Sequence, residues 1–479
     1  MSWHSLLNPL RRRPSTGKSY ARTEGRTEFE RDYDRILFST PVRRMADKTQ
    51  LFPQEMHDAI HTRLTHSHEV SAVARGIGAD LVVRYGTALG MNVGALQIRN
   101  VSALMAAIGL VHDIGNPPFG HQGEVAIRDW FRANKETVFD KTSNVDDLTQ
   151  QDFLRFDGNA QAFRLVTTLQ LQGDKYGLNL TYGTLATLLK YTVLAHECNK
   201  DDRLAARRKP GYFKSEAAIV KEVWKKTSLD PGRRHPLTFL VEACDDMTYS
   251  AIDVEDTVKK DLASYADVCA HLENLVQSSS PKKQENLLKR VIKHSRKQRE
   301  TIAKSSPGKS PSPAELDDLS MQVFRVAAIS AMAAAALQTF VAKFAAIRDG
   351  SFEGDLLDAG DAALLRNGLK TFLSQVAFSH RSVLEIELHG TQVLQELMDK
   401  LWAAIITRAD RATTEPKRTD PLSAYTYSRI SENYRRVFEG SSPSLPMRYR
   451  EAQLLVDMVA GMTDSFALSL LRDLRRFDR

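Results

Sequence analysis

The chain has 479 residues, of which 42% are hydrophobic and 26% charged, values ordinary for a soluble globular protein. Its formal net charge of +7 favours anionic partners such as phosphates, nucleotides or nucleic acid, although a mild excess over this length also serves solubility alone. The three cysteines make no Cys-x-x-Cys pair, and their odd number argues against a disulfide framework and fits a reducing cytoplasm.

The first 35 residues are polar and rich in both charges, as in "RRRPSTGKSYARTEGRTEFERDYDR". The apolar stretch at the start is too short for a signal peptide. We therefore predict a flexible basic segment over residues 1–35.

Helical periodicity dominates the rest of the chain. In "HEVSAVARGIGADLVVRYG", Val70, Val73, Ile77 and Leu81 recur at three- and four-residue spacing, which places them on one helix face. Further helices are predicted over "LATLLKYTVLAH", "PLTFLVEACDDMTYSAIDVEDTV", "GTQVLQELMDKLWAAIITRA" and "EAQLLVDMVAGMTDSFALSLLRDL". Strand signals are scarce, so we predict an all-α fold.

The composition divides the chain after residue 35 into three parts: a helical core over 36–260, an insert over 261–320 and a C-terminal helical region over 321–479 that packs on the core. Within the insert, 277–315 is basic and Ser/Pro/Lys-rich at both ends, which predicts one exposed helix between flexible arms. The Ala-rich stretch 326–342 falls short of a membrane span and is typical of a tightly packed core helix.

Three places in the sequence can supply metal ligands. They are His66, the adjacent pair His112 and Asp113, and the pair Asp245 and Asp246. Imidazole with carboxylate suits a divalent cation with positions left open for water and substrate. An isolated His-Asp pair is a weak signal, because such pairs also occur at ordinary helix ends.

The segment "HDIGNPPFGHQGE", residues 112–124, follows an apolar helix with glycines and prolines that fix a tight bend. Beyond the bend, His121 and Glu124 lie three residues apart at the start of a predicted helix and share a face. A carboxylate beside an imidazole raises its basicity and fixes its tautomer, although a helix cap with an incidental histidine has the same pattern.

Asp245, Tyr249 and Asp253 follow one another at four-residue steps in a predicted helix. Such steps keep the three side chains within roughly 80° and about 6 Å apart along the axis. A ligand, an aromatic ring and a carboxylate in a line about 12 Å long match a nucleotide lying along the helix. The alternative for Tyr249 is a half-buried core tyrosine.

Together these blocks resemble the HD-domain deoxynucleoside triphosphate triphosphohydrolases, the bacterial dGTPase group. The resemblance runs in order through "RILFSTPVRRMADKTQLFP", "HTRLTHSHEV", "HDIGNPPFGHQGE", "FDGNAQAFRL", "LLKYT", "GYFKSE", "EACDDMTYSAIDVED" and "ISENYRRVFEG". It covers roughly residues 28 to 260, with one further matching block near residue 430. The resemblance implies that 36–260 is an HD phosphohydrolase core.

The resemblance implies one divalent metal ion per subunit, Mn or Mg before Fe, Ni, Co or Zn, held by His66, His112, Asp113 and Asp245. Asp245 is preferred to Asp246 because the family has a small residue before its ligand. Some HD enzymes bind two metals through further histidines, but the resemblance gives His196 and His235 no role.

The resemblance also assigns the chemistry. His121 and Glu124 fall on the family's catalytic pair, with His121 protonating the departing 5′-oxygen. Tyr249 would pack on the sugar and exclude a 2′-hydroxyl, while Gln50 and Asp253 would bond the 3′-hydroxyl. Because the metal alone cannot balance a triphosphate, we expect phosphate contacts from Arg63 and Lys190. The remaining substrate-binding candidates are Leu51 and Asn116.

The expected reaction is hydrolysis of a dNTP, dGTP favoured, to deoxynucleoside and inorganic triphosphate. Another HD nucleotidase or phosphodiesterase is the first alternative. A nucleic-acid-binding or regulatory scaffold that uses the pocket as a nucleotide sensor is the second. The resemblance further implies a homo-oligomer, tetramer or hexamer, and in some members a nucleotide activator and binding of single-stranded DNA. A membrane is not expected.

Overall fold

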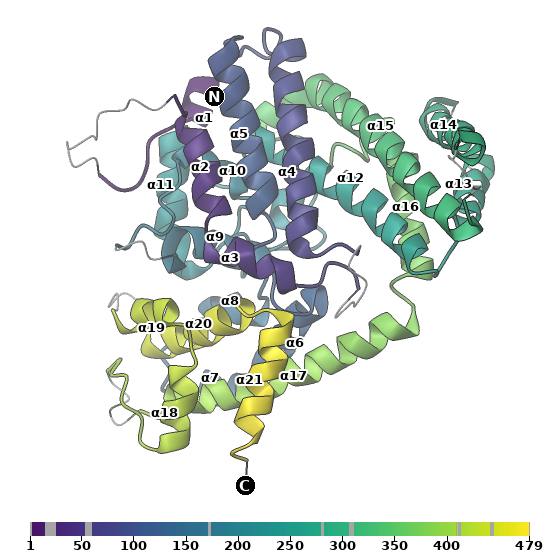
Figure 1. The fold of residues 1–479 in the computed structure, drawn as a ribbon. Helices are drawn as coiled ribbons and strands as arrows, with labels where there is room; N and C mark the ends of the chain where they lie inside the picture. The colour runs from purple at the N-terminus through teal and green to yellow at the C-terminus, as the bar shows by residue number, and fades with distance from the viewer. Residues whose placement is uncertain are drawn as a thin grey trace.

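The computed structural model describes residues 2–14, 25–52, 60–170, 174–278, 282–305, 311–408, 410, 413–440 and 445–478. These residues form helices joined by loops, and among them β-structure is limited to isolated bridges (Figure 1). The prediction of an all-α fold is therefore confirmed.

The α-helices, in chain order, are α1 (Trp3–Leu6), α2 (Glu28–Leu37), α3 (Thr40–Arg44), α4 (Arg63–Asp80), α5 (Ala95–Val111), α6 (Gly120–Ala133), α7 (Lys135–Val138), α8 (Asp147–Leu154), α9 (Gly158–Arg164), α10 (Tyr182–Leu188), α11 (Ala217–Thr227), α12 (Pro236–Lys259), α13 (Tyr265–Ser278), α14 (Lys282–Ser305), α15 (Pro313–Asp349), α16 (Ala363–Val376), α17 (Arg381–Ile406), α18 (Pro421–Ser428), α19 (Glu432–Glu439), α20 (Met447–Ala460) and α21 (Asp464–Arg475).

Helices α4, α5 and α12 form the centre of the upper half of the molecule (Figure 1). Helix α4 starts sharply, because the hydroxyl of Thr62 accepts the backbone N–H of Thr65 and the Thr65 hydroxyl accepts that of Thr62. Helix α5 lies unusually close to α4 at Gly109, where an added Cβ would come within 2.8 Å of the Ser71 backbone. This close approach brings the ends of the two helices toward α12.

The helix predicted over "LATLLKYTVLAH" is only half correct. Helix α10 begins after the Thr181 cap, but it ends at Leu188 and the following residues are irregular. The apolar residues beyond that point, Leu189, Val193 and Ala195, are buried all the same. Burial alone therefore produced the apolar pattern there, and Lys190 extends from a loop.

The N-terminal segment is partly packed. Trp3 and Leu6 of α1 are buried, and the Trp3 ring stacks on Phe344 of α15 with centroids 5.8 Å apart. These contacts differ from the flexible segment expected for residues 1–35, because two apolar side chains anchor its start. Residues 15–24 lie outside the described part of the chain.

The predicted insert contains helix α14, which packs against α15. Helix α15, by length and hydropathy alone, would be long enough to cross a membrane, but it packs along α12 in the fold. Only 44% of its most apolar window is buried, and Val326 is 59% exposed. The helix predicted around 326–342 is therefore present, but its packing is one-sided rather than tight.

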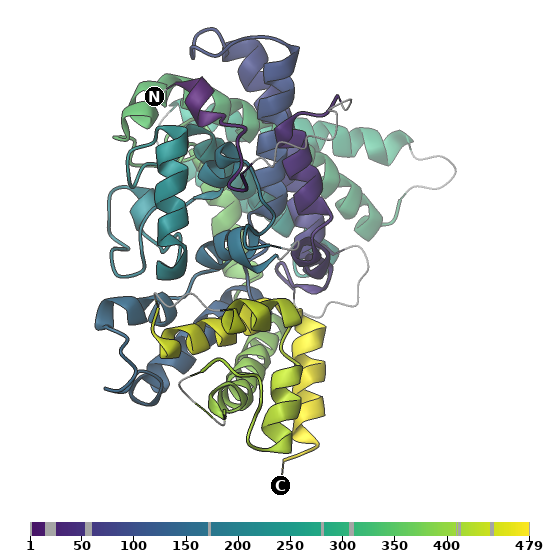
Figure 2. The ribbon, with the colours of Figure 1, turned by 90° about the vertical axis from the view of Figure 1, so that its left-hand side faces the viewer.

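Helices α17 to α21 form the lower half of the molecule together with α6, α7 and α8, whereas α15 and α16 lie in the upper half beside α12 (Figures 1 and 2). Helix α17 packs along α6, and α20 contacts α9. Helices α20 and α21 meet at a bend of 115°. The C-terminal region thus contacts the segments that carry the "HQGE" and "FDGN" motifs.

Candidate metal centre and active site

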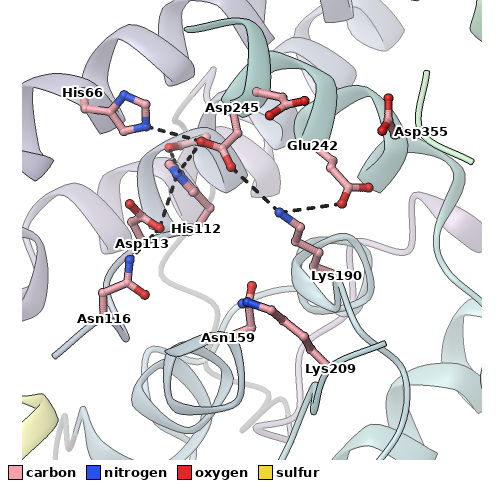
Figure 3. A network of polar contacts seen from close by, with 12 residues as sticks. His66, His112, Asp113, Asn116, Asn159, Lys190, Lys209, Glu242, Asp245 and Asp355 are labelled. Carbon is pink, nitrogen blue, oxygen red and sulfur yellow. Dashed lines mark hydrogen bonds and ion pairs between the residues drawn. The ribbon is translucent and has the colours of Figure 1, made fainter. Parts of the chain in front are cut away.

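Three helices bring two imidazoles and a carboxylate together. His66 lies in the first turns of α4, His112 ends α5, and Asp245 lies in the middle of α12. The Nε2 atoms of His66 and His112 are each 3.3 Å from Asp245 Oδ1 (Figure 3). Nitrogen and oxygen donors that converge within 4.8 Å of one another can hold a divalent cation.

Hydrogen bonding prepares His112 as a ligand. Its Nδ1 lies 2.8 Å from the carbonyl oxygen of Gly109, which can only accept, so the ring donates there and leaves the Nε2 lone pair free. Buried Nε2 has no other hydrogen-bond partner in the described residues. Burial would raise the pKa of Asp245, but His112, His66 and Lys190 hold it well below its ordinary value. The carboxylate is therefore ready to bind a cation.

Asp113 lies beside this cluster but is engaged elsewhere. One of its oxygens forms an ion pair with Arg63, and the other accepts a 2.8 Å hydrogen bond from the Asn116 amide. The second oxygen is 3.6 Å from His112 Nε2. Ligation by Asp113 would require it to loosen one of these bonds.

Asp246 faces away from the cluster, because consecutive residues on a helix are turned by about 100°. Its carboxylate pairs with Arg366, 2.6 Å away, and with Lys370 of α16. The arrangement agrees with the choice of Asp245 over its neighbour.

A cavity of about 80 Å³ adjoins the cluster, between α5, α9, α10 and α12. The Lys190 ammonium extends into it and lies 3.8 Å from Asp245 Oδ2 and 3.7 Å from Glu242 Oε1 (Figure 3). Glu242 in turn binds Arg234 at 2.8 Å. A cation thus stands next to the cluster, where an anionic substrate group could bind.

His121 and Glu124 form the pair expected from the sequence. His121 Nδ1 is 3.1 Å from Glu124 Oε2, and the other oxygen of Glu124 accepts a 2.7 Å hydrogen bond from the Gly158 backbone. Glu124 is buried whereas the His121 side chain is 69% exposed. Burial raises the pKa of Glu124, but the hydrogen bond from His121, the charge of Lys209 and the Gly158 N–H together outweigh it, and the net pKa is lowered.

The residues expected to bind the sugar retain unused hydrogen-bonding capacity. Asp253 is fully buried, and neither of its oxygens has a partner in the described residues; Gln50 Oε1 is in the same state. Burial, with the charge of Asp256, raises the pKa of Asp253 well above its ordinary value. Tyr249, four residues before Asp253 on α12, is half-buried, and Leu51 is buried. Orphaned polar groups of this kind are typical of a binding site.

The sequence did not point to four further polar residues: Asn159 and Glu242, which line the cavity, and Arg234 and Lys209 behind them. Figure 3 shows Asn159 and Lys209 on the side opposite the imidazoles. Asn159 could have been found from the sequence, since it lies in the "FDGNAQAF" block, two residues after the Asp157 cap of α9. Lys209 is in irregular chain, where no spacing could point to the site; it lies 3.4 Å from Asp157.

Known relatives extend over nearly the whole chain, although no protein-family model matches it. A deoxyguanosinetriphosphate triphosphohydrolase-like protein of Listeria monocytogenes is 33% identical over 99% of both chains. One of the same name from Pseudomonas aeruginosa is 32% identical over 99% of this chain and 98% of its own. The deoxyguanosinetriphosphate triphosphohydrolase of Klebsiella pneumoniae is 30% identical over 92% of each.

Proposed function

Because the chain belongs to the deoxyguanosinetriphosphate triphosphohydrolase family, we propose that it hydrolyses deoxynucleoside triphosphates, dGTP in preference, to the deoxynucleoside and inorganic triphosphate. The observation that carries the proposal is the convergence of His66, His112 and Asp245 beside a lysine-lined cavity.

The cluster would hold one divalent cation, Mn²⁺ or Mg²⁺, with Asp113 as a fourth ligand. Such a cation supplies Lewis-acid polarisation of the α-phosphoryl group and acidifies nearby water. The residues of the chain do the remaining work. Lys190 and Arg63 bind the phosphates, and Asn116 orients the bend that carries Asp113.

His121 is the proposed proton donor to the departing 5′-oxygen. Glu124 fixes its Nδ1, which leaves Nε2 to face substrate, and the Gly158 backbone holds Glu124. Tyr249 would pack on the deoxyribose, and the unpaired oxygens of Gln50 and Asp253, with Leu51 alongside, would receive the 3′-hydroxyl. These roles select a deoxynucleotide over a ribonucleotide.

The products decide between this reaction and the other HD chemistries. Purified protein with Mn²⁺ and dGTP should yield deoxyguanosine and triphosphate on ion-exchange chromatography. His121→Gln should lower kcat by about 10²–10⁴, because the leaving group loses its acid. Asp129→Asn, on the exposed side of the same helix, is the control and should retain full activity. Release of dGMP with pyrophosphate would contradict the proposal.

A second activity, binding of single-stranded DNA, is favoured by the charge of α14. That helix holds nine lysines and arginines against two glutamates, a net charge of +7 that equals the excess of the whole chain. A fluorescent oligonucleotide should bind with an affinity that falls steeply with salt. The double variant Lys293→Glu, Lys297→Glu should abolish binding and leave dGTP hydrolysis intact; unchanged binding would overturn the assignment to α14.

For the assembly we propose a homo-oligomer, either a tetramer or a hexamer. We further propose that a second nucleotide activates the enzyme, so that turnover of one dNTP alone is slow. Light scattering during gel filtration gives the subunit number, and assays of dNTPs singly and in mixtures reveal activation. The three free cysteines fit a cytoplasmic location.

A further inference from the structure

The bend between α20 and α21, residues 460–465 and here called the elbow, contacts two segments that border the candidate site, 47–49 and 116–119. The buried ammonium of Lys48 donates to the Asn116 carbonyl at 2.6 Å and to the Ala460 carbonyl at 2.9 Å. Ser465 donates to Asp47 at 2.8 Å. The elbow lies more than 300 residues from these segments in sequence, so the fold alone brings them together.

Asp464, the first residue of α21, joins these two segments with its two oxygens. Oδ2 accepts the backbone N–H of Thr49 at 3.0 Å and also the Thr49 hydroxyl. Oδ1 accepts the backbone N–H of Phe119 at 3.0 Å. The residue is 3% exposed, so water does not compete for these bonds.

Each segment leads directly to a residue of the proposed reaction. Thr49 precedes Gln50, and it forms a β-bridge with Thr62, the cap of the metal-ligand helix α4. Phe119 caps α6 in the left-handed conformation, with φ of 59°, and stands two residues before His121. A non-glycine residue adopts this conformation only where its surroundings hold it there.

We propose that Asp464 is a positioning residue that sets the distance and angle between the sugar-binding segment at Gln50 and the proton-donating turn at His121. This inference rests on the proposed function for the roles of those two residues. The bridge itself, one carboxylate between two backbone N–H groups, stands on the structure alone.

A carboxylate is the group that fits this position. Both N–H donors need an acceptor oxygen, and an asparagine would turn its NH₂ toward one of them. The negative charge also sits at the N-terminus of α21, where the helix dipole favours it, and near the buried Lys48 ammonium. Asp464→Asn therefore removes one arm of the bridge with almost no change of volume.

Hydrogen–deuterium exchange tests the bridge without reference to activity. In Asp464→Asn, amide exchange in peptides covering 47–52 and 117–122 should both rise by about tenfold, because a charge-assisted bond is lost and the segments loosen together. Asp473→Asn, the same change further along α21, should leave both peptides unchanged. Unaltered exchange in the two peptides of Asp464→Asn would overturn the bridge.

Kinetics test the positioning role. The ratio of kcat/KM for dGTP over 2′,3′-dideoxy-GTP measures the use of the 3′-hydroxyl, and it should fall about tenfold in Asp464→Asn together with kcat. Mn²⁺ affinity should stay as in the parent, which a general unfolding would not allow. An unchanged ratio with altered exchange would reject the role in the reaction while keeping the bridge; an inactive parent would reject only the proposed function.

A milder variant covers the case in which Asp464→Asn fails to fold. Thr49→Val keeps the backbone N–H and the side-chain volume but removes the hydroxyl donor to Asp464. Exchange should rise in 47–52 and not in 117–122, and the 3′-hydroxyl ratio should fall severalfold. If neither the exchange in 47–52 nor the 3′-hydroxyl ratio changes, the proposal is contradicted.

Discussion

Two adjacent carboxylates of α12 have unrelated partners. Asp245 faces the imidazoles of His66 and His112, whereas Asp246 pairs with Arg366 and Lys370. From sequence, the choice between them rested on family resemblance, because the residues that decide it lie far away along the chain. The clustering of His66 with His112 was likewise beyond any local pattern.

The pair offers a matched test of metal binding. Asp245→Asn should lower Mn²⁺ affinity at least about tenfold and abolish dGTP hydrolysis, since a neutral amide is a poor ligand. Asp246→Asn should bind Mn²⁺ as the parent does. It should instead cost about 1.5–3 kcal/mol of unfolding free energy, because charged hydrogen bonds to α16 are lost. Isothermal titration and chemical denaturation give the two quantities; equal loss of Mn²⁺ in both variants would contradict the assignment.

His61 connects the entry of α4 to α12. Its Nδ1 is 2.9 Å from Asp256 Oδ1 and its Nε2 is 3.5 Å from Glu69 Oε2. Burial opposes the charged ring, but the two carboxylates outweigh it and raise the pKa of His61 to about 10. In the unfolded chain the pKa is about 6.5.

Because the folded pKa is the higher one, His61 contributes full stability below about pH 6.5 and loses it as the pH rises toward about 10. His61→Gln should therefore lower the melting temperature most at pH 6 and progressively less up to pH 10. Melting curves of parent and variant across this range check the trend. A difference that grows with pH would show that the ring is neutral in the folded protein.

At the scale of elements, two glycines let the bend after α5 meet α9. A Cβ on Gly115 would lie 2.1 Å from the Gly158 carbonyl, and one on Gly158 would lie 2.3 Å from Asn116 Oδ1. The backbones therefore touch directly, and this contact sets Glu124 against the Gly158 N–H. The sequence predicted the bend from its Gly and Pro residues but not the partner that required them.

Gly115→Ala should destabilise the protein strongly, by more than about 2 kcal/mol, since backbone rather than a flexible side chain must move. Gly76→Ala is the control, and its effect on the unfolding free energy should have the opposite sign. Gly76 lies exposed within α4 with nothing near its Cβ position, so alanine should add about 0.5–1 kcal/mol through helix propensity. Urea denaturation measures both. Equal effects would show that the contact at Gly115 carries no packing constraint.

Helix prediction succeeded where burial and periodicity agreed, and it failed where only burial was present. The helix predicted over 236–258 is present as α12 (Pro236–Lys259), which has its polar face toward the cavity. The stretch after Leu188 was predicted as helix, because a buried loop shows the same apolar residues as a buried helix. The turn between α20 and α21 was missed for a similar reason, because the apolar pattern continues on both sides of 461–463 although the helix breaks there.

At the scale of the whole molecule, a buried ion network joins the two halves. Arg164 of α9 binds Asp457 of α20 with both Nε, at 2.8 Å, and Nη2, at 2.7 Å, and it binds Glu216 at 2.7 Å. All three side chains are almost fully buried. The charge of Arg164 is thus neutralised in part by a residue almost 300 positions away in sequence, which no local sequence pattern could predict.

Asp457→Asn should lower the unfolding free energy by about 3–5 kcal/mol, because Arg164 keeps its buried charge but loses a counter-charge. Asp473→Asn, which breaks a partly exposed pair with Arg429, should cost at most about 1 kcal/mol. Both variants should unfold in one transition if the halves form a single cooperative unit. Separate transitions in the parent protein would show that the C-terminal helices are an independent domain.

The proposed reaction depends on a single cation held by His66, His112 and Asp245. Metal-depleted protein should be titrated with Mn²⁺ in the presence of dGTP. At each step the bound Mn²⁺ is measured, and the triphosphate produced is measured by ³¹P NMR. We predict that triphosphate production rises in proportion to bound Mn²⁺ and saturates at one ion per chain. Full triphosphate production by the metal-depleted protein, or by Asp245→Asn, would contradict it.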